Sequence, residues 1–387
     1  MLEYFLTEEQ KMIKDLAAQI AREKIEPLAL EYDEKGTFPW DIVEILGKSD
    51  LFGVFIPEEY GGLGGGVFEM CLVVEELSKA CGGISLAYAA SALGTIPIIL
   101  FGSDEQKKKY LPRLATGEIL AAFALTEPDA GSDAAAIKTK AELKGDNYIV
   151  NGTKQWITNG GEAFINTVIV ISDPNRGARG SSALLVEKGT PGFEFGKKEN
   201  KMGIRASATR ELIFQDARIP KENLLGREGQ GFLIAMKTFD QSRPGVAAQA
   251  VGIAAGALEK AVAYSRERYQ KGQPISSFQG IQFMLADMAT KVEAARALTL
   301  QAAKTIDSGA KNVSKISSMA KLFASNVAME VTTDAVQVYG GYGYMKEYPV
   351  EKMMRDAKIT QIYEGTNQIQ KEVIALQLIK ESVRRKG

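Results

Sequence analysis

Three short segments hold the polar and glycine residues whose types and spacing could support chemistry. Glu364 stands beside Gly365 in a break within an otherwise long helical pattern, where a carboxylate can act as a base or simply cap the next helix. The segment 339–344 (YGGYGY) could let a ligand approach the backbone, and the segment 126–133 (TEPDAGSD) has the composition of a loop. Taken one at a time, these segments fit helix ends and turns as well as they fit a site.

The rest of the composition narrows the chemistry. The 387-residue chain contains no histidine, which excludes metal sites built on imidazole and Ser-His or Cys-His nucleophile pairs. Its two cysteines, Cys71 and Cys81, provide no disulfide framework and fit a reducing compartment. We therefore expect no metal site, a cytoplasmic location, and chemistry that depends on a carboxylate or a cofactor.

Charge and hydropathy argue against polyanionic and membrane partners. The 47 basic residues nearly cancel the 48 acidic ones, so no nucleic-acid or anionic-membrane surface is expected, and Lys107–Lys109 reads as a solvated helix face. Residues 82–103 are uncharged and long enough to span a bilayer, but glycines and Pro97 interrupt them. The pattern predicts buried helices with a break near Pro97 and no membrane insertion. The N-terminus lacks the basic flank and cleavage site of a signal peptide.

The periodicity divides the chain into three domains, at 1–120, 121–228 and 229–387. The first is helical, with capping boxes predicted from Thr7 with Gln10 and from Ser103 with Gln106. The second carries short β-like runs that favour a small antiparallel sheet or barrel, at 148–152, 168–171, 183–186 and 212–214. The third carries four long helical patterns that favour a four-helix bundle, at 229–270, 278–308, 313–338 and 348–382.

Together the three segments match one family in order and spacing. The chain resembles the acyl-CoA dehydrogenases over essentially all of its length, through the opening TEEQ, the segment PEEYGG at 57–62, the loop 125–133, the segment 154–160 and the terminal run 362–370. It is most similar to the short- and medium-chain, butyryl-CoA dehydrogenase-like branch. The resemblance implies a mainly α fold with a helical N-terminal domain, a β-barrel middle domain and a C-terminal four-helix bundle, assembled as a homotetramer (a dimer of dimers).

The resemblance also implies FAD as the cofactor of an oxidoreductase. Thr158 would hydrogen-bond flavin N5, while Arg268 and Gln279 would reach the flavin of a neighbouring subunit. The residues implied to bind the cofactor are Phe123, Leu125, Thr126, Gly131, Ser132, Trp156, Ile157, Thr158, Arg268, Gln279, Gln337, Gly340, Gly341, Gly343, Thr366, Asn367 and Gln368.

Glu364 stands where this branch has its catalytic glutamate. Isovaleryl- and long-chain-type members place the carboxylate at the position matching Ser242, and a serine without histidine is a poor base near neutral pH, so Glu364 is predicted to remove the α-proton. The backbone amide of Glu364 and a ribityl hydroxyl would stabilise the enolate, while the β-hydrogen leaves as hydride to N5. The residues implied to contact acyl-CoA are Ser132, Asp240, Ser242, Arg243, Tyr363 and Gly365.

The acyl group is less well defined. No charged residue lies between 82 and 103, the region that forms the inner wall of the acyl pocket in this family, which disfavours dicarboxylic substrates. Short or medium straight chains are favoured, although Tyr88, Ser91 and Tyr342 could meet a polar or cyclic tail. Branched, alicyclic and aromatic groups stay open.

Two residues of this chain depart from the pattern of the family. Lys271 replaces a phenylalanine of many relatives and Leu376 replaces an arginine near the CoA end, so neither contact is carried over.

The electron acceptor implied by the resemblance is an electron-transferring flavoprotein. The same residues could also serve an enoyl-CoA reductase or an acyl-CoA oxidase. A different kind of alternative is a non-catalytic binding protein with the same fold, including one that binds nucleic acid.

Overall fold

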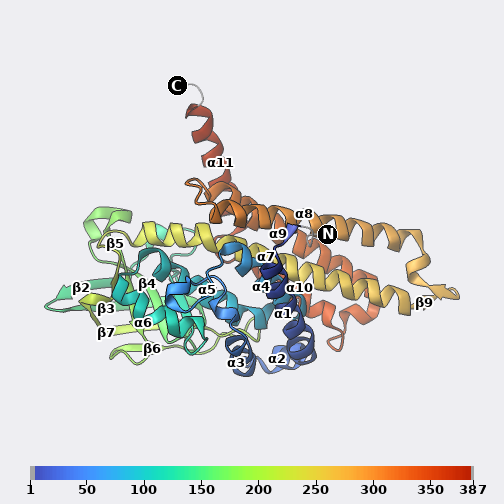
Figure 1. Ribbon diagram of the computed structural model, residues 1–387, viewed down its shortest axis with the longest axis horizontal. Helices are drawn as coiled ribbons and strands as arrows, with labels where there is room; N and C mark the ends of the chain where they lie inside the picture. The colour runs from blue at the N-terminus through green and yellow to red at the C-terminus, as the bar shows by residue number, and fades with distance from the viewer. Residues whose placement is uncertain (1–4, 385–387) are drawn as a thin grey trace.

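The computed structural model describes residues 5–384 and begins with a helical part (Figure 1). Both predicted capping boxes are confirmed, because the backbone N–H groups of Gln10 and Gln106 donate to the hydroxyls of Thr7 and Ser103 at 3.2 Å. The α-helices of this part are α1 (Glu8–Ile20), α2 (Ala29–Lys35), α3 (Trp40–Lys48), α4 (Val67–Ala80), α5 (Gly82–Phe101) and α6 (Asp104–Ala115).

Helix α5 differs from the sequence prediction at Pro97. The helix is continuous from Gly82 to Phe101, so the predicted break near Pro97 is wrong. Proline removes one backbone donor and crowds the preceding turn, but α5 is packed against α4, α7 and strand β1 (Ala121–Ala124), and this tertiary packing keeps the helix intact.

Two helices are long and apolar enough to cross a membrane by length and composition, namely α5 and α7 (Gly231–Glu267). In each helix 72% of the most apolar window is buried within the protein, as in the core helix of a water-soluble domain. Their hydropathy is therefore explained by packing inside the fold.

The middle part is one mixed sheet of eight strands, so the predicted β middle domain is confirmed. Its path is β6-β7-β3-β2-β4-β5-β8, and β1 pairs with β4. Neighbours are mostly antiparallel, as expected, but the pairs β1–β4 and β2–β4 are parallel and make the sheet mixed. Besides β1, the strands are β2 (Lys140–Lys144), β3 (Asn147–Thr158), β4 (Ile165–Ile171), β5 (Ser181–Glu187), β6 (Phe193–Phe195), β7 (Thr209–Pro220) and β8 (Leu224–Leu225).

The C-terminal part returns to long helices. Helices α7, α8 (Gln279–Asp307) and α9 (Ser314–Tyr339) lie side by side in Figure 1, and a short hairpin of β9 (Tyr269–Gln270) and β10 (Gln273–Pro274) precedes α8. The fourth predicted helical pattern is divided into α10 (Pro349–Ile359) and α11 (Asn367–Arg384). The break between them contains Glu364, so the position of the predicted helix interruption is confirmed.

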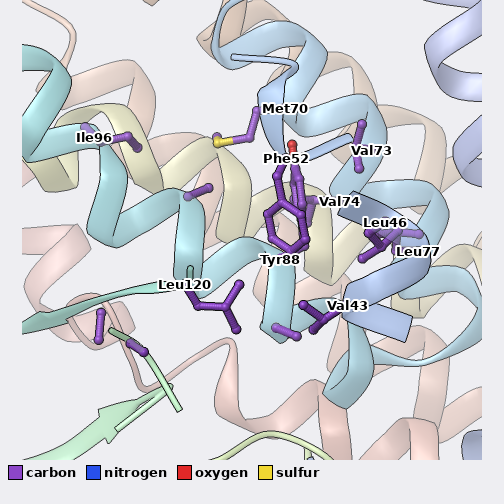
Figure 2. Close-up of a cluster of buried hydrophobic side chains, with 14 of the residues drawn as sticks. Val43, Leu46, Phe52, Met70, Val73, Val74, Leu77, Tyr88, Ile96 and Leu120 are labelled. Atoms are coloured by element: carbon purple, nitrogen blue, oxygen red, sulfur yellow. The ribbon is translucent and has the colours of Figure 1, made fainter. Parts of the chain in front are cut away.

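The N-terminal helices close over an apolar core that reaches the long helix α7. In Figure 2, Phe52 and Tyr88 lie against each other beside Val74 of α4, and Leu77 of the same helix lies next to Leu46. The ring centroids of Phe52 and Tyr88 are 5.4 Å apart. This core fixes α4 and α5 relative to the start of the sheet, and both helices later contribute to the wall of the main cavity.

Helices α4 and α7 approach each other through glycines of α7. A Cβ atom placed on Gly252 would lie 2.3 Å from the carbonyl oxygen of Glu75, and one on Gly256 would lie 2.2 Å from that of Lys79. Because backbone atoms cannot move aside cheaply, glycine at these two positions is what permits the close crossing.

We expect Gly256→Ala to lower the free energy of unfolding by about 1–3 kcal/mol, because the added methyl overpacks a backbone contact. Denaturant unfolding of the two proteins measures the difference. Glu259→Ala, on the exposed face of the same helix, serves as the control and should change little. Equal stability of Gly256→Ala and the parent would show that the contact between α4 and α7 adjusts to a methyl group without loss of stability.

Candidate active site

Glu364 occupies a tight turn between α10 and α11. Its φ of 51° and the φ of 87° at Gly365 both lie in the left-handed region, which a glutamate rarely adopts. The side chain of Gln370, on the first turn of α11, donates to the carbonyl oxygens of Glu364 at 3.1 Å and Gly365 at 2.9 Å. The turn is therefore held in an unusual backbone conformation by hydrogen bonds from the helix that follows it.

The carboxylate of Glu364 lies among polar groups of α7 and α9. Ser242 Oγ donates a hydrogen bond of 2.6 Å to Oε2. Burial raises the pKa of Glu364 above its usual value, while the Ser242 hydrogen bond and the positive charges of Arg243 and Lys321 act in the opposite direction. A carboxylate with a raised pKa that remains able to ionise suits a general base near neutral pH.

A cavity of about 390 Å³ opens in front of this carboxylate. Helices α4, α5 and α7, strand β3, the loop after β1 and the turn at Glu364 all contribute to its wall. The predicted site residues that line it are Phe123, Leu125, Thr126, Gly131, Ser132, Trp156, Ile157, Thr158, Ser242, Arg243, Tyr363, Glu364 and Gly365. The fold thus brings the predicted base, many predicted cofactor residues and most predicted substrate residues to one space.

One part of this cavity is almost entirely apolar. Its wall there consists of side chains from α4 and α5, with Val246 of α7. The sequence pattern indicated the region of α5 but none of these lining side chains. The side chains are Met70, Val74, Leu86, Ala89, Ala90 and Leu93. Gln249 and Tyr363 meet in the same wall, where the tyrosine hydroxyl donates to the glutamine carbonyl.

The polar α5 residues proposed to meet a substrate tail do not line this cavity. Tyr88 is fully buried against Phe52, and the hydroxyl of Ser91 accepts a hydrogen bond of 3.1 Å from the backbone of Ala121. Tyr342 lies elsewhere, with its ring 5.4 Å from the guanidinium of Arg268. The expectations for Tyr88 and Ser91 are wrong because the α5 face that carries them packs into the protein core, and Tyr342 lines a different hollow at the end of α9.

A second hollow collects another group of predicted cofactor residues at the end of α9. Arg268, Gly340 and Gly341 line it together with several tyrosines. Gly343 is packed instead against α9, where a Cβ would lie 2.4 Å from the carbonyl of Val336. Gln279 and Gln337 are exposed on α8 and α9. The structure therefore separates the predicted cofactor contacts into two groups within one chain.

The three polar residues after Gly365 have different surroundings. Thr366 caps α11, where its hydroxyl accepts from the backbone of Ile369 at 3.3 Å, and Gln368 is exposed. The Asn367 side chain is buried and bonded to Ser325 and Asn326 of α9. Asp240 does not line the main cavity, because it is buried and bonded to Ser314 at 2.7 Å.

The two departures lie at the surface. Lys271 is exposed in the hairpin turn, with a φ of 52°. Leu376 is exposed on α11 and is not among the residues that line the main cavity, although Glu372 and Val373 one turn earlier are. Neither side chain takes part in the cavity that contains Glu364.

A buried ion pair that sequence analysis did not identify anchors the loop after β1. Lys154 of β3 is fully buried and donates to the carbonyl of Leu125 at 2.9 Å and to Glu127 at 2.7 Å. Glu127 also accepts from the backbone of Lys138 and Thr139 at 2.6 Å and 2.9 Å. Burial lowers the pKa of Lys154 to about 8, and Glu127 limits the fall. The pair ties the strand that carries Trp156 and Thr158 to the loop that carries Thr126 and Ser132.

We expect Lys154→Met to lower the free energy of unfolding by about 3–5 kcal/mol, because it leaves the Glu127 carboxylate buried without a cation. Denaturant unfolding measures the loss, and the double variant with Glu127→Gln should recover part of it. Lys138→Met, which removes the exposed partner of Asp129, is the control and should unfold like the parent. A loss in the control as large as that of Lys154→Met would contradict the role given to the buried pair.

Comparison with protein-family models identifies all three parts of the chain. Residues 7–118 match the acyl-CoA dehydrogenase N-terminal domain, residues 122–217 the middle domain and residues 229–379 the C-terminal domain. These three matches follow the helical, β and helical parts of the structure in order.

Individual relatives cover nearly the whole chain. The acryloyl-CoA reductase (NADH) of Anaerotignum propionicum is 50% identical, over 98% of this chain and 96% of the relative. Butyryl-CoA dehydrogenase from Megasphaera elsdenii superimposes with a TM-score of 0.94 at 47% identity, covering 97% and 99% of the two chains. A chain from the structure of the electron transferring flavoprotein of Acidaminococcus fermentans gives 0.95 at 53% identity, with the same coverage. The protein therefore belongs to the acyl-CoA dehydrogenase family of FAD-dependent oxidoreductases.

Proposed function

We propose that this acyl-CoA dehydrogenase oxidises the α,β-bond of an acyl-CoA thioester to the trans-2-enoyl-CoA, with Glu364 as the base that removes the α-proton. The observation that carries the proposal is the position of the Glu364 carboxylate. It faces the same cavity as Thr126, Trp156 and Thr158, and its pKa is raised by burial. A base at this position can reach a substrate held between the turn and strand β3.

The turn also offers a donor for the charge that develops during proton removal. The backbone N–H of Glu364 donates no hydrogen bond to any group in residues 5–384. An α-hydrogen of a thioester is far too weak an acid for a carboxylate in water, so the enolate oxygen must be stabilised. We propose that this free amide donates to the thioester oxygen, and that the missing side chain at Gly365 leaves room for the thioester.

The side chains around the cavity fit FAD. In the described part of the chain, the side chains of Thr126, Ser132, Trp156 and Thr158 make no hydrogen bond, although all four line the cavity. A Cβ on Gly131 would have no neighbour within 4 Å, so the loop backbone is open to a ligand. When bound, FAD supplies the acceptor for the β-hydrogen, which leaves as hydride. We propose that this group of residues holds the flavin ring beside Glu364.

The predicted cofactor residues outside the main cavity fit contacts to a second FAD molecule. We propose that Arg268, Gln279, Gln337, Gly340, Gly341 and Gly343 contact the FAD of a neighbouring subunit in a homotetramer. Exposed apolar side chains on α11 support an assembly, because Leu378, Ile379 and Val383 would otherwise face water. Thr366, Asn367 and Gln368 stay predicted cofactor residues.

The apolar wall favours a short or medium straight acyl chain. No lysine or arginine lies among the cavity residues of α4 and α5, and Arg243 of α7 already contacts Asp240 at 3.5 Å and Ser318 at 3.3 Å. A terminal carboxylate would therefore be desolvated without a partner. The similarity to a butyryl-CoA dehydrogenase supports the same substrate class.

The relatives bear on both the electron partner and the direction of the reaction. Similarity to a chain solved with the electron transferring flavoprotein of Acidaminococcus fermentans supports an electron-transferring flavoprotein as acceptor. The second candidate is the reverse reaction, reduction of an enoyl-CoA, which the reductase of Anaerotignum propionicum favours. The buried free thiols of Cys71 and Cys81 fit the cytoplasmic location that we propose.

We expect Glu364→Gln to retain its flavin and to lose about 10²- to 10⁴-fold in turnover, because the amide cannot accept the α-proton. Anaerobic bleaching of the flavin absorbance measures the reaction with acyl-CoAs of increasing chain length and with branched, cyclic and dicarboxylic ones. Glu372→Gln, which alters another carboxylate of the same cavity, is the control. Full activity of Glu364→Gln would disprove the base assignment, and bleaching only by dicarboxylic substrates would disprove the acyl class.

We expect Ser242→Ala to move the acidic limb of the kcat/KM profile to higher pH, by about one pH unit, because the lost hydrogen bond had favoured ionised Glu364. Activity rises with pH as the base ionises, so a higher pKa shifts the rise upward. Steady-state rates across pH 5–9 measure the shift. Thr238→Ala, a buried change on the same helix, should leave the profile in place. A downward shift in Ser242→Ala would contradict the argument.

A further inference from the structure

Lys321 of α9 is a buried lysine that no part of the predicted site includes. Its side chain is 0% exposed, and its Nζ donates to the carbonyl oxygen of Gly365 at 2.8 Å and to Asn367 Oδ1 at 3.0 Å. No carboxylate within residues 5–384 forms a salt bridge with it. Burying an ammonium group without an ion-pair partner costs desolvation free energy, so the presence of Lys321 at this position calls for an explanation.

The hydrogen bonds of Lys321 go to the turn that carries Glu364. Two successive residues of this turn have left-handed φ values, which persist only when the surroundings hold them. Gln370 holds the turn from α11, whereas Lys321 and Asn367 tie it to α9, because Asn367 is bonded to Lys321 and Ser325 together. Removing Lys321 would leave the Gly365 carbonyl with the Gln370 bond alone.

Lys321 also brings a cationic group to the residue next to Glu364, because its Nζ lies 2.8 Å from the Gly365 carbonyl oxygen. The charged groups that act on it are Glu364 and Arg243, and burial lowers the pKa of Lys321 to about 7 while Glu364 limits the fall. Arg243 comes from α7, where it contacts Asp240 and Ser318. The charge on Lys321 in turn favours the ionised form of Glu364.

Building on the proposed role of Glu364 as base, we propose that Lys321 is the positioning residue of that base: its ammonium braces the turn at Gly365 and brings a positive charge to the residue next to Glu364. The two contributions can be separated, because an uncharged amine still has two N–H donors and can keep both hydrogen bonds. Loss of the charge alone changes the ionisation of Glu364, and loss of the side chain also releases the turn.

The test compares Lys321→Met with Lys315→Met in the flavin-loaded enzyme. Lys315 lies on the same helix and also contacts α11, through Glu381 at 2.6 Å, but it does not touch the turn. We expect Lys321→Met to lower kcat by about ten-fold or more with KM changed by less than about three-fold, and to move the acidic limb upward by about one pH unit. Lys315→Met should keep the parent profile.

Two further variants keep the outcome decisive. If Lys321→Met does not fold, as judged by Tm and by the flavin spectrum, Lys321→Gln replaces it, because glutamine offers N–H donors without charge and should shift the limb while recovering part of kcat. An acidic limb identical to that of the parent in a folded Lys321 variant would overturn the proposal, as would a lower Tm with no change in the profile. Glu364→Gln separates the two hypotheses: if it stays active, the base assignment fails, and if it is inactive while Lys321→Met behaves like the parent, only the role of Lys321 fails.

Discussion

The site depends on one backbone constraint, the left-handed turn that interrupts the C-terminal helical run at Glu364 and Gly365. A continuous helix from α10 into α11 would carry this side chain along a regular helix face. The turn instead points the carboxylate toward Ser242 at 2.6 Å and into the main cavity. Because two successive residues adopt φ values above 50°, the turn needs support from both sides, and Gln370 and Lys321 supply it.

The same burial that shapes the turn sets its electrostatics. Burial of the carboxylate raises the pKa of Glu364, and the Ser242 hydrogen bond and the cations of α7 and α9 limit the rise. A similar compromise holds the loop after β1, where Lys154 and Glu127 are buried as a pair. In both places charged groups lose hydration on burial, and their contacts fix the position of segments that line the cavity.

Sequence patterns predicted the architecture well where a local signal existed. Both capping boxes, the four β runs and the glycine break at Glu364 could be found because each depends on residues that are close in the chain. The break expected at Pro97 was wrong because the packing around α5 overrides a local preference. The expectation that Tyr88 and Ser91 reach the cavity was wrong for a related reason, since α5 carries no charged residue to show which of its faces packs into the core.

The residues that sequence analysis missed share a physical character: they act through contacts between distant segments. Lys154 meets Glu127 across 27 positions, and Lys321 meets Gly365 across 44. In the sequence each lysine resembles any charged residue of a strand or helix, because nothing nearby shows that its side chain turns inward. Only the folded structure shows that these lysines are buried, and their contacts then identify the backbone segments that they hold. Both lysines hold segments that line the cavity in front of Glu364, so buried contacts position the groups that would meet the substrate and the cofactor.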